Sequence, residues 1–228
     1  MSRRAPGTAG SGAPRPSAPG RLLLALGAGL LVPAALAAQQ DPAALPLCEA
    51  GTEAGDCALP TETGYLTFAY GDDGTVTVTQ TDTDGLRKGA PILLEAAGGA
   101  AAPVLKDLSG DERPEVLVPV ASGGPNVTYA VLARDGMGAY IPAGEIAAMG
   151  ADGIEIGPEG TIRSVTRDGA AALSESADVW TVDGLERVYT LTVDLEARRC
   201  TLDEDARPEM LGESAASVVA RCEEREWP

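Results

Sequence analysis

The segment YLTFAYGDDGTVTVT, residues 65–79, decides the fold class of this chain. Residues 65–70 and 75–79 are two alternating runs of β-forming residues, rich in aromatic and β-branched side chains, a pattern typical of strands. Between them lies Gly71-Asp72-Asp73-Gly74, and Asp and Gly tolerate the positive φ angles of tight turns. The segment therefore predicts a β-hairpin.

The same pattern recurs along the chain. Asp-Gly pairs stand at residues 73–74, 84–85, 135–136, 152–153, 168–169 and 183–184, and each predicts a chain reversal. Short runs of β-forming residues lie between them, at 115–121, 128–133, 154–156, 161–166 and 185–193. We therefore predict a mainly β fold of antiparallel hairpins that form a sandwich, a barrel or a curled sheet.

Helix signals are few. Residues 214–221 form the best candidate, with Val218 and Val219 able to face inward, and residues 144–149 could form one short helical turn. No long amphipathic segments separate the strand runs, which disfavours a parallel α/β sheet. The prediction is one short C-terminal helix on a β-rich domain.

The first 38 residues have the three parts of a secretory signal peptide. Four arginines and no acidic residue precede an uncharged apolar run at 22–38, which ends in Ala35-Leu36-Ala37. A membrane span needs about 20 apolar residues, whereas this run is shorter and contains Pro33. We predict cleavage after Ala37 or Ala38, no membrane span afterwards, and a periplasmic or secreted protein.

The remaining chain is acidic. Residues 1–38 carry four arginines and no acids, so their removal takes the net charge from −17 to −21. Such a surface repels nucleic acid and anionic lipid. Residues 39–62 are rich in Ala, Pro and acid and predict a flexible lead-in, and residues 63–228 predict a single β-rich domain.

The chain contains no histidine. This excludes Ser-His and Cys-His nucleophile pairs and histidine-ligated zinc, and we do not expect an enzyme. A hydrolase that uses carboxylates alone, such as a glycosidase, is the enzymatic alternative. A structural envelope protein without a ligand is another.

The cysteines predict disulfides. Cys48, Cys57, Cys200 and Cys222 all follow the signal segment, and an even count suits an oxidising compartment. We favour the local pairs Cys48–Cys57 and Cys200–Cys222, because each closes a short loop near one end. A crossed or end-to-end arrangement stays open.

One loop has the spacing of a calcium site. Asp107, Ser109, Asp111 and Glu115 occupy loop positions 1, 3, 5 and 9 between apolar runs. Calcium binds six to eight oxygen ligands, so a carbonyl near Arg113 and waters would have to complete the shell. A tight turn, in which the side-chain oxygens accept backbone amides, explains the same residues.

Residues 104–120 resemble the FG-GAP (VCBS-type) repeat, whose strands flank a loop of the form D-x-N-G-D-G-x-x-D. Here Ser109 replaces the asparagine, Glu112 the second glycine and Glu115 the last aspartate. The resemblance implies calcium binding by the loop and adhesion or partner binding by the domain. Only one copy is visible, so a propeller of such repeats is not implied. Our functional hypothesis is an exported, non-enzymatic binding or envelope-associated module with an unknown protein or envelope partner, in which calcium bound to the loop would stabilise the fold.

Overall fold

The computed structural model describes residues 42–49, 52–53, 55–97, 101–157 and 160–227. The chain divides into the units Met1–Ala38 and Gln39–Pro228, and all described residues belong to the second. The predicted signal peptide, residues 1–38, therefore lies outside the described residues.

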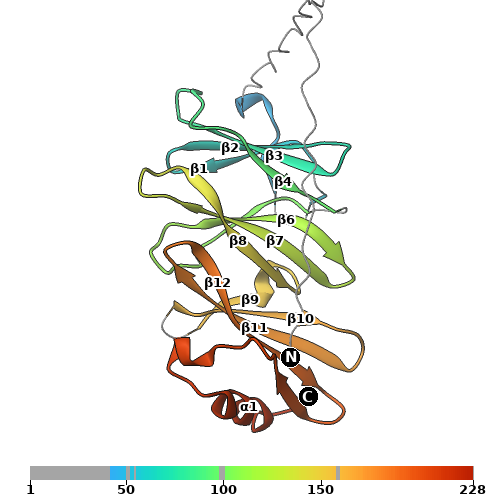
Figure 1. The fold of residues 1–228 in the computed structure, drawn as a ribbon. Helices are drawn as coiled ribbons and strands as arrows, with labels where there is room; N and C mark the ends of the chain where they lie inside the picture. Colours follow the sequence, from blue (N-terminus) through green and yellow to red (C-terminus); the bar gives the residue numbers. More distant parts are fainter. Residues whose placement is uncertain (1–41, 50–51, 54, 98–100, 158–159, 228) are drawn as a thin grey trace, which may run out of the picture. The chain divides into compact units, whose positions relative to one another are not determined.

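The described strands form three open sheets, in which neighbours in sequence pair antiparallel (Figure 1). The first sheet contains β1 (Cys57–Thr61), β2 (Gly64–Tyr70), β3 (Thr75–Thr81) and β4 (Ile92–Glu95). The second contains β5 (Val104–Lys106), β6 (Glu115–Gly123), β7 (Asn126–Arg134) and β8 (Tyr140–Ala148). The third contains β9 (Ile154–Ile156), β10 (Ile162–Arg167), β11 (Ala172–Thr181), β12 (Gly184–Asp194) and β13 (Arg199–Leu202). The predicted mainly β, antiparallel fold is confirmed, and none of these sheets closes into a barrel.

The hairpin that the sequence predicted is β2–β3. Its register pairs Tyr65 with Thr81 and Tyr70 with Val76. In the turn, Asp73 Oδ1 accepts hydrogen bonds from the amide and the hydroxyl of Thr75, at 3.1 and 2.7 Å. Gly74 has φ 80°, a left-handed conformation that glycine adopts without strain. The side chain of Asp73 and the freedom of Gly74 together reverse the chain.

The other Asp-Gly pairs fall in connections between strands, with one difference from the prediction. Residues 84–85, 135–136, 168–169 and 183–184 lie at reversals within a sheet. Residues 152–153 lie instead in the 3-10 helix η2 (Ala151–Gly153), where the chain passes from the second sheet to the third.

The first core joins the first and second sheets. Phe68 and Val78 pack there with Val118 and Leu132, and all four side chains are fully buried. Alternate residues of β2 and β3 supply the first sheet's share, as the two-residue period of a strand requires. The alternate apolar residues that the sequence predicts for these two strands thus point into this core.

The second core lies on the other face of the second sheet. Leu117 points to the opposite side of β6 from Val116 and Val118, and it packs with Ile146 of β8 and Ile162 of β10. β6 is therefore buried on both faces, which explains why its sequence is a continuous apolar run rather than an alternation.

A third core lies between the third sheet and α1 (Ala215–Glu223). Ser214 caps the helix, because its hydroxyl accepts the Ser217 amide at 3.1 Å. Val218 of the helix packs in this core with Tyr189 and Leu191 of β12. The predicted C-terminal helix is present, and both Val218 and Val219 contact the core.

Two local predictions were wrong. Residues 144–149, predicted as a helical turn, lie largely in β8, because Gly144 pairs with Val131 and Ala147 with Thr128 of β7. The ordered sheet also begins before residue 63. β1 and the 3-10 helix η1 (Pro42–Ala44) fall inside the predicted lead-in 39–62. β1 is an edge strand, where Pro60 is tolerated, and its five residues, CALPT, are too short a run to show a strand periodicity.

Candidate functional site

The loop between β5 and β6 holds its own backbone through its carboxylates. Asp107 accepts the Gly110 amide on Oδ1 at 2.7 Å and the Glu112 amide on Oδ2 at 3.0 Å. The Ser109 hydroxyl donates to Asp111 Oδ1 at 2.9 Å. These bonds are those of a compact turn built on side-chain oxygens.

Two acids of the loop, Asp111 in its middle and Glu115 at its end, experience opposite environments. Asp111 is exposed, and hydrogen bonds from the Arg113 amide and the Ser109 hydroxyl lower its pKa. Glu115 is only 6% exposed, and burial raises its pKa, while its bond from the Leu108 amide at 2.6 Å acts in the other direction. The buried Glu115 carboxylate, at the end of the loop, thus binds the backbone near its start.

The loop also joins the second and third sheets. The Leu108 side chain is fully buried in the second core. Its carbonyl accepts a hydrogen bond from Trp180 Nε1 of β11 at 3.2 Å. A single residue therefore ties the loop to both sheets.

Two residues of the loop have left-handed backbone conformations: Gly110 at φ 75° and Glu112 at φ 65°. Glycine adopts this region freely, whereas a residue with a Cβ is strained there. Glu112 therefore keeps the sharp turn that the resemblance assigns to glycine, at a cost in backbone strain.

As arranged here, the proposed calcium ligands fit a turn better than a metal cage. Asp107, Asp111 and Glu115 all accept hydrogen bonds from loop amides, whereas calcium requires six to eight oxygens that converge on the ion. No group of three or more His, Cys, Asp or Glu side chains in the described part of the chain could hold a metal. Calcium binding by Asp107, Ser109, Asp111 and Glu115 stays a prediction.

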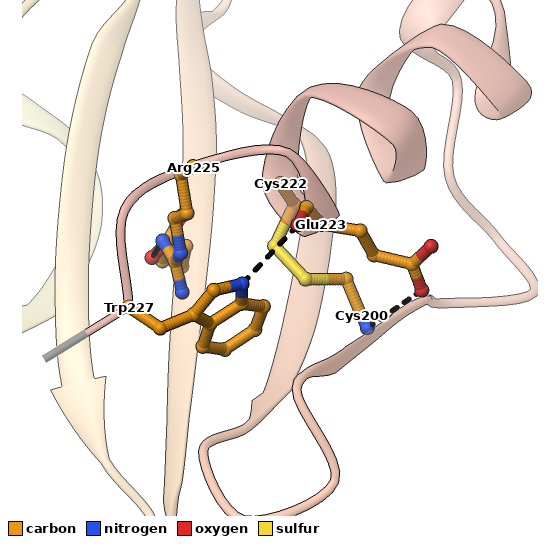
Figure 2. Close-up of a disulfide and its surroundings, with 6 residues drawn as sticks. Cys200, Cys222, Glu223, Arg225 and Trp227 are labelled. Atoms are coloured by element: carbon orange, nitrogen blue, oxygen red, sulfur yellow. Dashed lines mark hydrogen bonds and ion pairs between the residues drawn. A yellow bond between two sulfur atoms is a disulfide. The ribbon is translucent and has the colours of Figure 1, made fainter.

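The cysteines form the local pairs, Cys48 with Cys57 and Cys200 with Cys222. The second disulfide joins β13 to α1, and Figure 2 shows it beside Glu223 and Trp227. Glu223 Oε1 accepts the Cys200 amide at 3.3 Å, and its carbonyl accepts Trp227 Nε1 at 3.2 Å. The C-terminal segment is therefore fastened to the sheet by covalent and polar contacts.

An open cavity of about 500 Å³ lies next to the loop, where the second core reaches the surface. Val104, Val127 and Ala151 line it and also pack against that core. Leu105 of β5 and Pro119 of β6 add further apolar lining. We call this cavity the β5–η2 groove. Its volume is in the range of small-molecule sites, which are mostly apolar with a few polar groups.

Three polar side chains line the β5–η2 groove: Lys106, Tyr129 and Asp152. Tyr129 is only 5% exposed, and burial, followed by the charge of Asp152, raises its pKa. Lys106 Nζ donates to the carbonyl of Ala151 at 2.7 Å, which ties β5 to η2. The groove thus combines apolar walls with a phenol, a carboxylate and an ammonium group.

Acids at two other cavities are engaged in the fold. Beside α1, a cavity of about 220 Å³ includes Glu175, which forms an ion pair with Arg225. Beside the first disulfide, a cavity of about 330 Å³ includes Asp56, whose Oδ1 accepts the Tyr70 amide at 2.9 Å. These carboxylates hold backbone and side chains in place.

Sequence reasoning missed the β5–η2 groove. Its lining comes from residues 101–106, 119, 127–129 and 150–152, which meet only after the second sheet has formed. The predicted runs 115–121 and 128–133 contain Pro119 and Tyr129, but no local pattern marks them as a surface cavity.

Comparison with protein-family models, curated proteins and solved structures finds no match to this chain. Within the described residues, no helix has the length and apolar character needed to cross a membrane.

Proposed function

We propose that this chain is an exported, non-enzymatic binding module that takes up a small, largely apolar ligand in the β5–η2 groove. The observation that carries the proposal is the cavity of about 500 Å³, with apolar walls and three polar groups. Two disulfides suit an oxidising compartment outside the cytoplasm. The signal pattern of residues 1–38 supports the same compartment.

The fold around the groove suits binding without large rearrangement. β5 continues into the loop at residues 107–115, which the Leu108–Trp180 bond fixes to the third sheet. Lys106, the last residue of β5, is hydrogen-bonded to η2. A ligand would therefore meet walls that are already ordered, and each buried CH₂ would contribute roughly 0.8 kcal/mol.

A titration with 1-hexanol, followed by NMR, tests the proposal. We expect saturable shifts of the amides of Val104, Tyr129 and Ala151. Val127→Thr keeps the shape of a groove residue but adds a hydroxyl, so it should weaken binding. Val165→Thr is the matched control, because Val165 is a half-buried strand residue in the third sheet, outside the β5–η2 groove. If no shifts concentrate at the groove, the proposal is wrong.

A further inference from the structure

We infer that the β5–η2 groove selects a ligand with a cationic head on its apolar body, such as an alkylammonium ion. This inference rests on the proposed function and adds the chemical class of the ligand. It follows from the state of the three polar groups in the groove and from the charge of the chain around them.

No protein group in the described part of the chain binds the two acceptor side chains of the groove. Asp152 is exposed in η2, and no hydrogen bond or ion pair joins its carboxylate to another described residue. The Tyr129 hydroxyl likewise has no hydrogen-bond partner among the described residues. Tyr129 lies close enough to Asp152 for the carboxylate charge to raise the phenol's pKa. A ligand that donates hydrogen bonds would find both an anionic and a neutral oxygen here.

The basic group in the groove is already engaged. The Lys106 ammonium donates to the Ala151 carbonyl at 2.7 Å and is half-buried beside it. No salt bridge joins Lys106 to Asp152, so the carboxylate is not neutralised by direct contact. Lys106 keeps its positive charge, but the Ala151 carbonyl holds one of its three donors in place, whereas no protein group occupies the acceptors of Asp152.

The charge of the chain favours the same sign of ligand. Its 34 acidic and 17 basic residues give a net charge of −17. A field of this sign attracts cations and repels anions as they approach. Salt limits its reach to about 8 Å at physiological ionic strength, so Asp152 is the local source of selectivity and the general field adds to it.

Three probes of equal chain length test the inference: hexylammonium, 1-hexanol and hexanoate, titrated by NMR at neutral pH and equal ionic strength. We expect hexylammonium to bind most tightly and hexanoate least. An exposed ion pair adds up to about fivefold in affinity, so that is the expected gain of the ammonium over the alcohol. Asp152→Asn should remove this gain.

Asp72→Asn is the matched control. It deletes the same charge from an exposed position in the β2–β3 turn of the first sheet, outside the groove. It should leave the preference for hexylammonium unchanged. If both variants lower that preference equally, only the general field acts, and the inference about Asp152 is wrong.

The remaining outcomes separate the two proposals. If none of the probes binds at the groove, the proposed function fails. If all three bind equally, the groove is an apolar site and the cationic class is wrong. If hexanoate binds most tightly, Lys106 sets the selectivity and the inference is overturned, while the proposed function stands.

Discussion

Glu112 is strained by its own position. Its φ of 65° costs a residue with a Cβ about 1–2 kcal/mol, which glycine avoids. Part of that gain is offset because glycine has more freedom in the unfolded chain. We expect Glu112→Gly to raise the free energy of unfolding by about 0.5–1 kcal/mol in urea titrations. Glu95→Gly, in the edge strand β4, should lower it, and a loss of stability for Glu112→Gly would contradict the strain.

Asp111 distinguishes the turn from the calcium site. Its carboxylate accepts the Ser109 hydroxyl and the Arg113 amide, both at 2.9 Å. The turn therefore predicts that Asp111→Ala lowers stability by about 1 kcal/mol, equally in calcium and in chelator. A calcium site predicts a melting temperature that rises with calcium, but not with magnesium at equal ionic strength, and an effect that Asp111→Ala abolishes. The geometry favours the first outcome, and thermal melting of both proteins in the two ions decides.

Asp178 predicts a pH dependence. It is only 2% exposed, and burial raises its pKa more than the bond from Arg187 Nε at 2.6 Å lowers it. Because the folded pKa exceeds the unfolded value of about 3.9, ionisation costs more in the folded state. Wild type should therefore lose stability relative to Asp178→Asn as the pH rises above about 4. Urea unfolding of both proteins across this range measures the difference, and an increase with pH would mean that Arg187 outweighs burial.

At the scale of elements, predictability follows how local the cause of each element is. β2–β3 were predictable because the alternation and the Asp-Gly turn lie within one short stretch. β11 was not, because Ser174, Glu175, Ser176 and Asp178 give it a polar sequence, and its pairing with β10 and β12 makes it a strand. The loop at 107–115 was recognised from its spacing. The β5–η2 groove was not, because it depends on contacts between segments far apart in sequence.

Contacts between sheets include two amide side chains that bind the backbone of a neighbouring sheet. Gln80 of β3 donates to the Tyr140 carbonyl at 2.6 Å and accepts the Tyr140 amide at 2.7 Å. Asn126 of β7 makes the same pair of bonds to Arg167 of β10, at 2.9 and 2.8 Å. The two pairs of hydrogen bonds, which we call the amide contacts, differ in burial. The amide contact of Gln80 is buried and that of Asn126 is exposed.

That difference in burial predicts that the same substitution, to Ala, lowers the free energy of unfolding by different amounts at Gln80 and Asn126. Gln80→Ala leaves two buried backbone groups without partners, so the free energy of unfolding should fall by about 2–4 kcal/mol. Asn126→Ala should cost less than about 1 kcal/mol, because water can replace its bonds. Urea unfolding of both variants gives the comparison. Equal losses of unfolding free energy would show that burial does not determine how much these amide contacts stabilise the fold.

At the scale of the described fold, the first and the third sheet each have an outer face. The two faces avoid exposing apolar surface to water in different ways. The outward side chains of β3 are Thr75, Thr77 and Thr79, which water can solvate. The outer face of the third sheet is apolar, and α1 covers it in the third core. Repeat proteins meet the same requirement, because their terminal units must present a polar outer surface or be covered.

Because α1 packs in the third core, we expect the third sheet to lose stability separately from the other two. We call α1 the cap of the third sheet. The third core shares no residue with the first or the second, so Val218→Asp, which places a charge in the third core, should loosen mainly β12 and β13. In hydrogen exchange, these strands should lose protection while β6 and β7 keep theirs. Ala216→Asp is the control: Ala216 is exposed in the first turn of α1, where a negative charge suits the helix dipole. If Val218→Asp lowers protection equally in β6 and β12, the sheets unfold as one cooperative unit, and the cap stabilises the whole stack rather than its last layer.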